Sequence, residues 1–212
     1  AKVKRFLCLS SLACGEDGPS LCRMRITGGI AAGLPLKTPS GRDVRPATDR
    51  TREAVFSSLG HRVAGSRVLD LFAGSGSYGL EAASRGAGEI LFVEKNARTA
   101  AVLERNLGGV LHNLRDAGRE PSLRILRRDA FRFRTTTAFD LVFMDPPYPL
   151  LRDRWAELLA MVAELPRSET VPILLLEAPA DLAIAHPQWR ARRRFGGRKS
   201  GDPAVHMLER TA

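Results

Sequence analysis

The chain has 212 residues, of which 44% are hydrophobic and 26% are charged. This length and composition are typical of one globular domain with a sizeable core. The formal net charge of +10 favours a polyanionic partner such as nucleic acid, although a basic surface that only aids solubility would give the same balance. No apolar run reaches the roughly 20 residues of a membrane-spanning helix, so we expect no membrane partner.

Cysteine usage separates the beginning of the chain from the rest. All three cysteines, Cys8, Cys14 and Cys22, precede Met24. The remainder of the chain can therefore form neither a disulfide nor a Cys-based metal site, which is compatible with a cytoplasmic protein. The four histidines show no metal-ligand spacing, and we expect no metal.

Residues 1–23 combine a basic start, a short apolar run and a cysteine among small residues. This pattern loosely resembles a bacterial lipoprotein signal, but the apolar run is short and contains two serines. We instead expect Met24 to be the natural start and residues 1–23 to be a non-native or disordered extension. They hold four basic and two acidic residues, so the rest still carries +8. We expect one domain over 24–212, made of an N-terminal hairpin and helix over 24–60 and a core over 61–212.

Helix and strand patterns alternate from residue 48 onward. Residues 24–47 are rich in glycine and proline and predict short strands and turns. Thr48 or Asp49 can cap the first helix, and Gly60 can end it. Apolar strands that alternate with helices predict an α/β fold, with a Rossmann-like parallel sheet covered by helices on both faces. We expect strands over 67–72, 89–94, 122–130, 139–145 and 171–178, helices over 48–60, 78–86, 97–118 and 152–165, and a C-terminal antiparallel hairpin from 190–197 and 203–210.

A glycine-rich loop, DLFAGSGSYG over residues 70–79, joins the first expected strand to the next helix. Its glycines let the backbone approach a ligand closely, and Glu94 at the end of the next strand can accept hydrogen bonds from ribose hydroxyls. A dinucleotide would place its pyrophosphate at this loop. S-adenosylmethionine would place its methionine part and sugar there, with Asp70 suited to its cationic ammonium group. The loop alone does not decide between the two cofactors.

A second motif, DPPY, follows the apolar residues LVFM. Because proline cannot extend a sheet ladder, the strand must end at Asp145, at the edge where doubly wound sheets bind ligands. Its carboxylate and rigid carbonyls would accept hydrogen bonds from the exocyclic amine of a base, and Tyr148 would stack on that base. Asp145 would also accept the proton that methyl transfer releases. The motif therefore favours S-adenosylmethionine, and we expect Asp145, Pro146, Pro147 and Tyr148 to be catalytic.

Four segments in this order and spacing resemble a known family: MRITGGIAAGLPL, RPATDRTREAVFSSL, DLFAGSGSYGLEAASRGA and FDLVFMDPPY. They are similar to those of the bacterial methyltransferases that modify the N2 amine of a guanine in small-subunit (16S) ribosomal RNA. These are class I S-adenosylmethionine-dependent enzymes. The glycine and DPPY motifs mark the broad class, and the RPATDRTRE block points to this family. The resemblance covers Met24 to the C-terminus.

The resemblance implies a seven-stranded methyltransferase sheet, S-adenosylmethionine as cofactor, and small-subunit ribosomal RNA, naked or in the assembled subunit, as the partner of a monomeric cytoplasmic enzyme. The family usually has two threonines after the RP pair, where this sequence has Ala47-Thr48. The residues that would form the cofactor site are Asp70, Phe72, Ala73, Gly74, Ser75, Gly76, Glu94, Lys95, Asp129, Ala130, Arg45 and Thr48.

Basic side chains near the first helix and in the C-terminal hairpin are candidates for contact with RNA phosphates. The arginines of the helix could instead pair with Asp49 or Glu53 on a solvated face. The basic hairpin could instead be a charged sheet edge that resists aggregation. The candidates for RNA contact are Arg25, Arg45, Arg50, Arg52, Arg194, Arg198 and Lys199.

Four other functions share some of these motifs. An adenine-N6 methyltransferase of DNA or RNA uses the same DPPY chemistry, but the connections here leave little space for a target-recognition region. A protein glutamine methyltransferase normally begins this motif with Asn, and the strong basicity also argues against it. A nicotinamide dehydrogenase would leave DPPY without a role. A non-catalytic RNA-binding module would show a broken glycine loop or lack Asp145, and both are intact.

Overall fold

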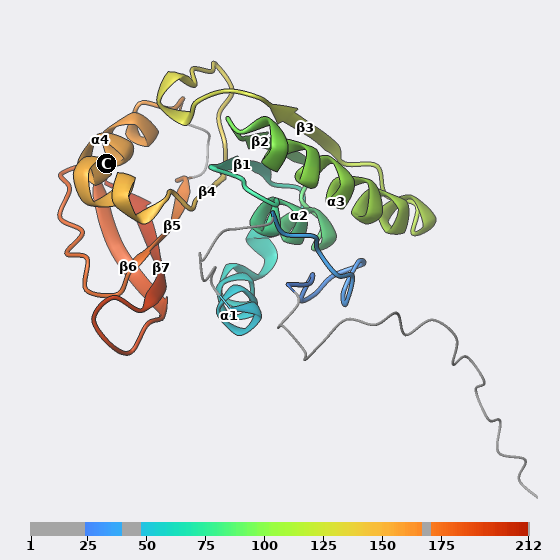
Figure 1. The fold of residues 1–212 in the computed structure, drawn as a ribbon, viewed down its shortest axis with the longest axis horizontal. Helices are drawn as coiled ribbons and strands as arrows, with labels where there is room; N and C mark the ends of the chain where they lie inside the picture. Colours follow the sequence, from blue (N-terminus) through green and yellow to red (C-terminus); the bar gives the residue numbers. More distant parts are fainter. Residues whose placement is uncertain (1–23, 40–47, 167–170, 212) are drawn as a thin grey trace, which may run out of the picture.

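The computed structural model describes residues 24–39, 48–166 and 171–211, and its centre is a seven-stranded sheet in the order β3-β2-β1-β4-β5-β7-β6 (Figure 1). The strands are β1 (Arg67–Leu71), β2 (Glu89–Val93), β3 (Ser122–Leu126), β4 (Leu141–Met144), β5 (Ile173–Pro179), β6 (Trp189–Gly196) and β7 (Pro203–Arg210). The helices are α1 (Asp49–Leu59), α2 (Ser77–Ser84), α3 (Ala97–Asp116) and α4 (Tyr148–Ala163), with short 3-10 helices at Gly60–Val63 and Ala130–Arg132.

The sheet is parallel from β3 to β5 and antiparallel where β7 joins β5 and β6. The predicted α/β fold with a C-terminal antiparallel hairpin is therefore confirmed. The chain first builds outward from β1 to β2 and β3, and then returns to build β4 and β5 on the other side of β1. Sheets that reverse direction in this way bind ligands at the carboxyl ends of the two strands that flank the reversal.

Two hydrophobic clusters cover opposite faces of the sheet. Phe56 of α1, Leu80 of α2 and Leu103 of α3 belong to one cluster, whereas Leu158 and Leu159 of α4 belong to the other. Each of these side chains is at most 2% exposed, and burial of a side chain of this size contributes about 1.5–3 kcal/mol. Helices on both faces leave only the edges at the strand ends open to a ligand.

The first helix has the ends that the sequence predicts. The Thr48 hydroxyl accepts a hydrogen bond from the Thr51 backbone N–H (3.2 Å), which satisfies one free donor at the start of α1. Gly60 follows the last residue of α1 with φ 56°, a conformation that glycine adopts without strain. This helix lies against α2 on the face of the sheet that Figure 1 shows toward the bottom.

Two element boundaries differ most from the sequence prediction, the end of β3 and the start of α4. Strand β3 ends at Leu126, because the chain then turns, and the Asp129 side chain accepts a hydrogen bond from Phe131 N (3.0 Å) in a 3-10 helix. Helix α4 begins at Tyr148, four positions before the predicted start, because proline is tolerated in the first turn of a helix. Helix α3 continues without a break through Gly108 and Gly109.

Among the helices in the described ranges, none is long and apolar enough to cross a membrane. The same ranges contain no group of three or more His, Cys, Asp or Glu residues arranged to hold a metal ion. The expectation of an N-terminal extension concerns residues 1–23, which lie outside the described residues. The division of the chain into domains stays a prediction.

Candidate active site

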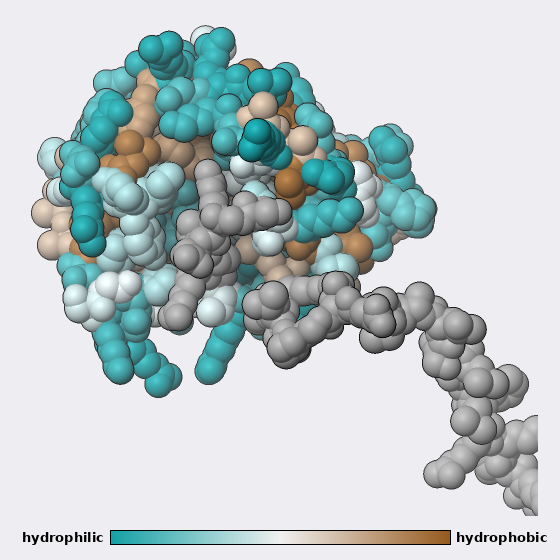
Figure 2. Space-filling model, in the orientation of Figure 1, coloured by the Kyte–Doolittle hydropathy of each residue, from teal (hydrophilic) through white to brown (hydrophobic). Residues whose placement is uncertain are grey.

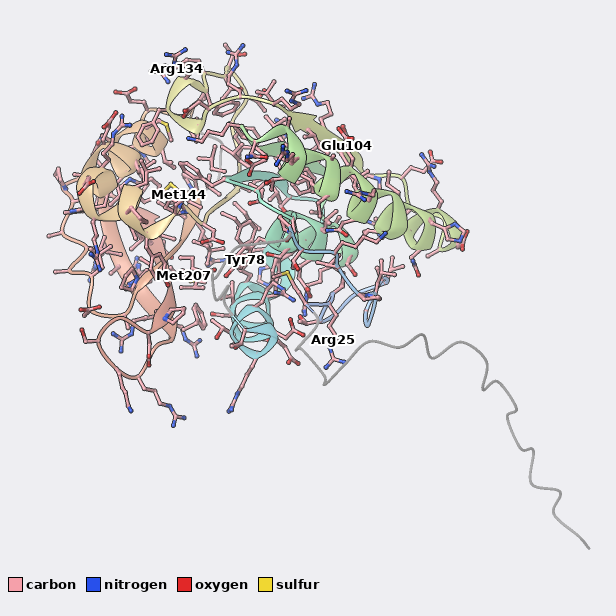
Figure 3. All side chains as sticks on the ribbon, in the orientation of Figure 1. Arg25, Tyr78, Glu104, Arg134, Met144 and Met207 are labelled. Carbon is pink, nitrogen blue, oxygen red and sulfur yellow. The ribbon has the colours of Figure 1, made fainter. Side chains whose placement is uncertain are left out.

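Three neighbouring strands end at one level of the sheet. Leu71, the last residue of β1, pairs with Val93 of β2 and with Met144 of β4. The next residues on these two strands are Glu94 and Asp145, so the acid after β2 and the acid after β4 lie on either side of the end of β1. Figure 3 shows Met144 near the centre of the molecule. The sequence predicts this edge as the ligand site, and the register brings its two motifs together.

The glycine loop between β1 and α2 has a conformation that few residues accept. Gly76 has φ 84°, and a Cβ placed on it would lie 2.2 Å from Leu103 Cδ1. Phe72, the first residue after β1, has φ 59°, which is uncommon for a residue other than glycine. The Glu94 carboxylate fixes the loop by accepting a hydrogen bond from Gly74 N (3.0 Å). The loop is therefore held in position by the acid that is predicted to bind ribose.

Asp70 lies below this loop rather than in the open edge. Its side chain is 2% exposed, and its carboxylate accepts a hydrogen bond from Gly79 N (2.9 Å) at the start of α2. Burial raises the pKa of Asp70 to about 8; the hydrogen bond from Gly79 opposes this shift, and the Glu94 charge adds to it. In this structure Asp70 stabilises the beginning of α2, and its predicted contact with an ammonium group stays a prediction.

Two tyrosines lie at the carboxyl ends of β4 and β5. The Tyr148 hydroxyl is buried and has no hydrogen-bond partner among the described residues. Burial, together with the charges of Glu177 and Asp145, raises the pKa of Tyr148 to about 12, so it stays neutral near pH 7. The Tyr78 hydroxyl donates to Glu177 (2.9 Å), and its ring stacks on Phe143 with 5.1 Å between centroids. The DPPY motif therefore lies beside a buried polar network.

A pocket of about 540 Å³ opens at this edge, a volume typical of small-molecule sites. It contains all four residues predicted to be catalytic and five of those predicted to bind the cofactor. The predicted residues that line it are Asp145, Pro146, Pro147, Tyr148, Phe72, Gly74, Glu94, Lys95 and Ala130.

The other residues predicted for the cofactor site do not line the pocket. Ala73, Ser75 and Gly76 are buried within the glycine loop, Thr48 caps α1, and the Asp129 carboxylate lies 3.7 Å from Lys95 Nζ. Arg45 lies outside the described residues. Any contact of these side chains with a ligand stays a prediction.

Six residues line the pocket without having been predicted. Val93 and Arg128 directly precede Glu94 and Asp129, which the sequence predicts for the cofactor site. This adjacency is a signal by which Val93 and Arg128 could have been found. Pro149 extends the DPPY motif. The last three come from the turn between β6 and β7, and no sequence signal connects that turn to the pocket: Gly201, Asp202 and Pro203.

The structure corrects one predicted RNA contact. Arg52 is only 1% exposed, donates to Asp49 Oδ1 (2.8 Å) and to the Arg25 carbonyl, and faces Glu81 at 3.5 Å. The prediction that it contacts RNA is wrong, because breaking these buried contacts would cost several kcal/mol. The alternative pairing with Asp49 is the one observed. The remaining candidates within the described ranges are exposed: Arg25, Arg50, Arg194, Arg198 and Lys199.

Comparison with known proteins identifies the family of this chain. Residues 24–201 match the family described as Conserved hypothetical protein 95. The chain belongs to this family. A relative from Bacillus subtilis named "Putative rRNA methyltransferase YlbH" is 37% identical over 126 residues, which is 59% of this chain and 67% of the relative. "Ribosomal RNA small subunit methyltransferase D" from Escherichia coli K12 is 35% identical over 128 residues, 59% of this chain and 61% of that protein.

Solved structures of similar chains agree with this family and with the fold. "Putative methyltransferase yhhF" from Escherichia coli superimposes with a TM-score of 0.72 at 29% identity, covering 90% of this chain and 99% of that one. A Thermus thermophilus protein, TTHA0928, gives a TM-score of 0.66 at 32% identity, covering 86% of this chain and 97% of that one. The family member described here therefore has the Rossmann-like methyltransferase fold that the sequence predicts.

Proposed function

We propose that this protein transfers a methyl group from S-adenosylmethionine to the N2 amine of a guanine in small-subunit ribosomal RNA. The observation that carries the proposal is the shared pocket. The glycine loop and Glu94 form one side of it, and Asp145 to Tyr148 form the other. A methyl donor and an amine acceptor would therefore meet in one pocket, and the names of the two curated relatives support ribosomal RNA as the acceptor.

The residues present fit S-adenosylmethionine. Each Glu94 oxygen accepts one backbone hydrogen bond, from Gly74 N (3.0 Å) and from Asn96 N (2.7 Å), which leaves further lone pairs for two ribose hydroxyls. Phe72 and Ala130 give the pocket apolar walls for a planar base. Tyr148 lines the same pocket beside Asp145. When bound, S-adenosylmethionine would supply an electrophilic methyl group.

The acceptor side supplies positioning and a base. An aromatic amine is a poor nucleophile, because its lone pair is delocalised into the ring. The Asp145 carboxylate would accept an N–H of that amine, favouring a more nucleophilic nitrogen, and would take up the proton released after transfer. The Tyr148 ring would stack on the base, which contributes about 1–3 kcal/mol. Because its pKa of about 12 keeps Tyr148 neutral, the stacked ring adds no charge near the amine.

The test is methyl transfer from labelled S-adenosylmethionine to small ribosomal subunits that lack their native modifications, with naked ribosomal RNA and duplex DNA as parallel substrates. Nucleoside analysis then identifies the product. We expect label in N2-methylguanosine. The matched variants are Asp145→Ala, which removes the proposed base, and Asp153→Ala, which removes an exposed carboxylate of α4 and should retain full transfer.

Each outcome separates one acceptor from another. Label in N6-methyladenine would replace guanine by adenine in this proposal. Cofactor binding without transfer to any nucleic acid would contradict the ribosomal RNA substrate and point to a protein acceptor. The parallel substrates also decide between naked RNA and the assembled subunit. The cytoplasmic location and the monomeric state stay predictions.

A further inference from the structure

The turn between β6 and β7 is held by side-chain carboxylates rather than by a hydrophobic core. Asp202 Oδ2 accepts hydrogen bonds from Arg198 N (3.0 Å) and Lys199 N (2.9 Å). Asp181 accepts from Ser200 Oγ (2.6 Å) and Gly201 N (2.9 Å). The residues from 198 to 201 are exposed, so these four bonds stabilise the turn together with the backbone hydrogen bond from Asp202 N to the Lys199 carbonyl (3.2 Å).

Asp181 joins this turn to the strand beside the DPPY motif. It follows β5, which pairs with β4 and therefore lies next to the strand that ends at Asp145. Just before it, Ala180 N donates to the Asp202 carbonyl (2.9 Å) and the Ala180 carbonyl accepts from Arg194 Nη1 (2.7 Å). The hydrogen bonds from Ser200 and Gly201 lower the pKa of Asp181, so it is a charged acceptor at neutral pH.

One side of the turn is a wall of the reaction pocket. Gly201, Asp202 and Pro203 line the same volume as Tyr148 and its neighbouring prolines. The other side carries the exposed Arg198 and Lys199. Figure 2 shows hydrophilic side chains projecting from the lower left of the molecule, where Figure 1 places this turn. Arg198 and Lys199 thus precede, by two or three positions in the sequence, the first residue of the turn that lines the pocket.

We infer that the β6–β7 turn is the RNA-binding wall of the pocket, and that Asp181 is a positioning residue. Through Ser200 and Gly201 it would hold the turn that carries Arg198 and Lys199 against phosphates flanking the target nucleotide. This inference rests on the proposed function. A fixed turn would keep both cations at one distance from the pocket, so that phosphate contacts place the base opposite Asp145. Asp181 itself would not touch RNA.

The sign of the effect of removing Asp181 makes the inference testable. Loss of a carboxylate from a protein that binds RNA strengthens binding when only long-range charge matters. Loss of a positioning residue weakens it. We expect Asp181→Ala to raise the KM for ribosomal RNA roughly five- to tenfold, with the KM for S-adenosylmethionine within about twofold of wild type. Asp181→Asn retains one acceptor oxygen and should give a smaller increase.

The control variants separate this effect from charge and from folding. Asp153→Ala removes a carboxylate from exposed α4, and its KM for RNA should stay the same or fall. Arg198→Ala/Lys199→Ala should raise the KM for RNA and reduce its salt dependence, whereas Arg115→Ala on distant α3 should do neither to the same extent. Thermal unfolding of each variant, measured beside the kinetics, shows whether the fold is retained.

The decisive arm combines the changes. If Asp181 acts through the two cations, Asp181→Ala should have almost no further effect on the KM for RNA in the Arg198→Ala/Lys199→Ala background. An unchanged or lower KM for RNA in Asp181→Ala would overturn the inference, and so would a fully additive effect in the combined variant. Both results leave the proposed function intact when wild type methylates RNA. Absence of transfer by wild type would contradict the proposed function and, with it, this inference.

Discussion

The two sides of the pocket are built in different ways. The side near β1 and β2 comes from the glycine loop and from residues that follow β2 and β3, and hydrogen bonds to Glu94 and Asp70 fix the loop. The opposite side combines the DPPY motif with a turn more than fifty residues later in the chain, which the pairing of β7 with β5 and hydrogen bonds to Asp181 and Asp202 hold in place. The first side is thus fixed by hydrogen bonds to its own loop, whereas the second depends on the long-range pairing of buried β7 with β5. Variants on the two sides should therefore fail differently.

The largest effect is expected on the acceptor side. Asp145→Ala should lower kcat by at least about 100-fold, because it removes both the acceptor of the amine hydrogen and the proposed base. The dissociation constant for S-adenosylmethionine, measured by calorimetry, should change by no more than about twofold. An equal loss of cofactor affinity would show that the two sides are not separable and would contradict the division drawn here.

On the other side of the pocket, a substitution in the glycine loop should act mainly on the stability of the fold. Gly76→Ala places a Cβ 2.2 Å from Leu103 Cδ1 at φ 84°, and we expect it to lower the free energy of unfolding by about 1–3 kcal/mol. The control is Gly108→Ala in α3, where nothing lies within 4 Å and alanine should stabilise the helix by about 0.5–1 kcal/mol. Urea unfolding of both variants measures the contrast; equal effects would mean that the loop yields to the new methyl group.

A smaller effect on the same side should appear in binding. Glu94→Gln retains one acceptor oxygen but loses the charge, so the dissociation constant for S-adenosylmethionine should rise by about tenfold. The rate at saturating cofactor should stay within about threefold of wild type, since Asp145 is untouched. A fall in kcat with an unchanged dissociation constant would mean that Glu94 acts in the methyl-transfer step rather than in cofactor binding.

The same contrast explains what the sequence could predict. The glycine loop, the strand end at Glu94 and the DPPY motif are each a contiguous stretch of sequence. Because parallel strands place their carboxyl ends at the same edge of a sheet, the order of the elements predicts that Glu94 and Asp145 lie near each other. The pocket wall at Gly201 to Pro203 depends on the pairing of β7 with β5 and on the hydrogen bond from Gly201 N to Asp181, contacts between distant segments that leave no local pattern. Arg52 was misassigned for a related reason: a charge in a helix pattern is expected on the surface, and only the buried Glu81 shows otherwise.

Asp70 offers the last and smallest test, through pH. Its pKa of about 8 in the folded protein lies above the ordinary value of 3.8, so the folded state holds this proton more tightly than the unfolded chain does. The resulting contribution to the free energy of unfolding is complete below about pH 4 and is lost as pH rises through about 8.

The variant Asp70→Asn cannot ionise and can still accept the hydrogen bond from Gly79. Its free energy of unfolding should therefore fall less than that of wild type between pH 5 and pH 9, by about 1 kcal/mol or more. Urea unfolding at both pH values measures the difference, with Asp153→Asn as a control that should follow wild type. Parallel curves for wild type and Asp70→Asn would mean that Asp70 is ionised at neutral pH, available after all to a cationic ammonium group.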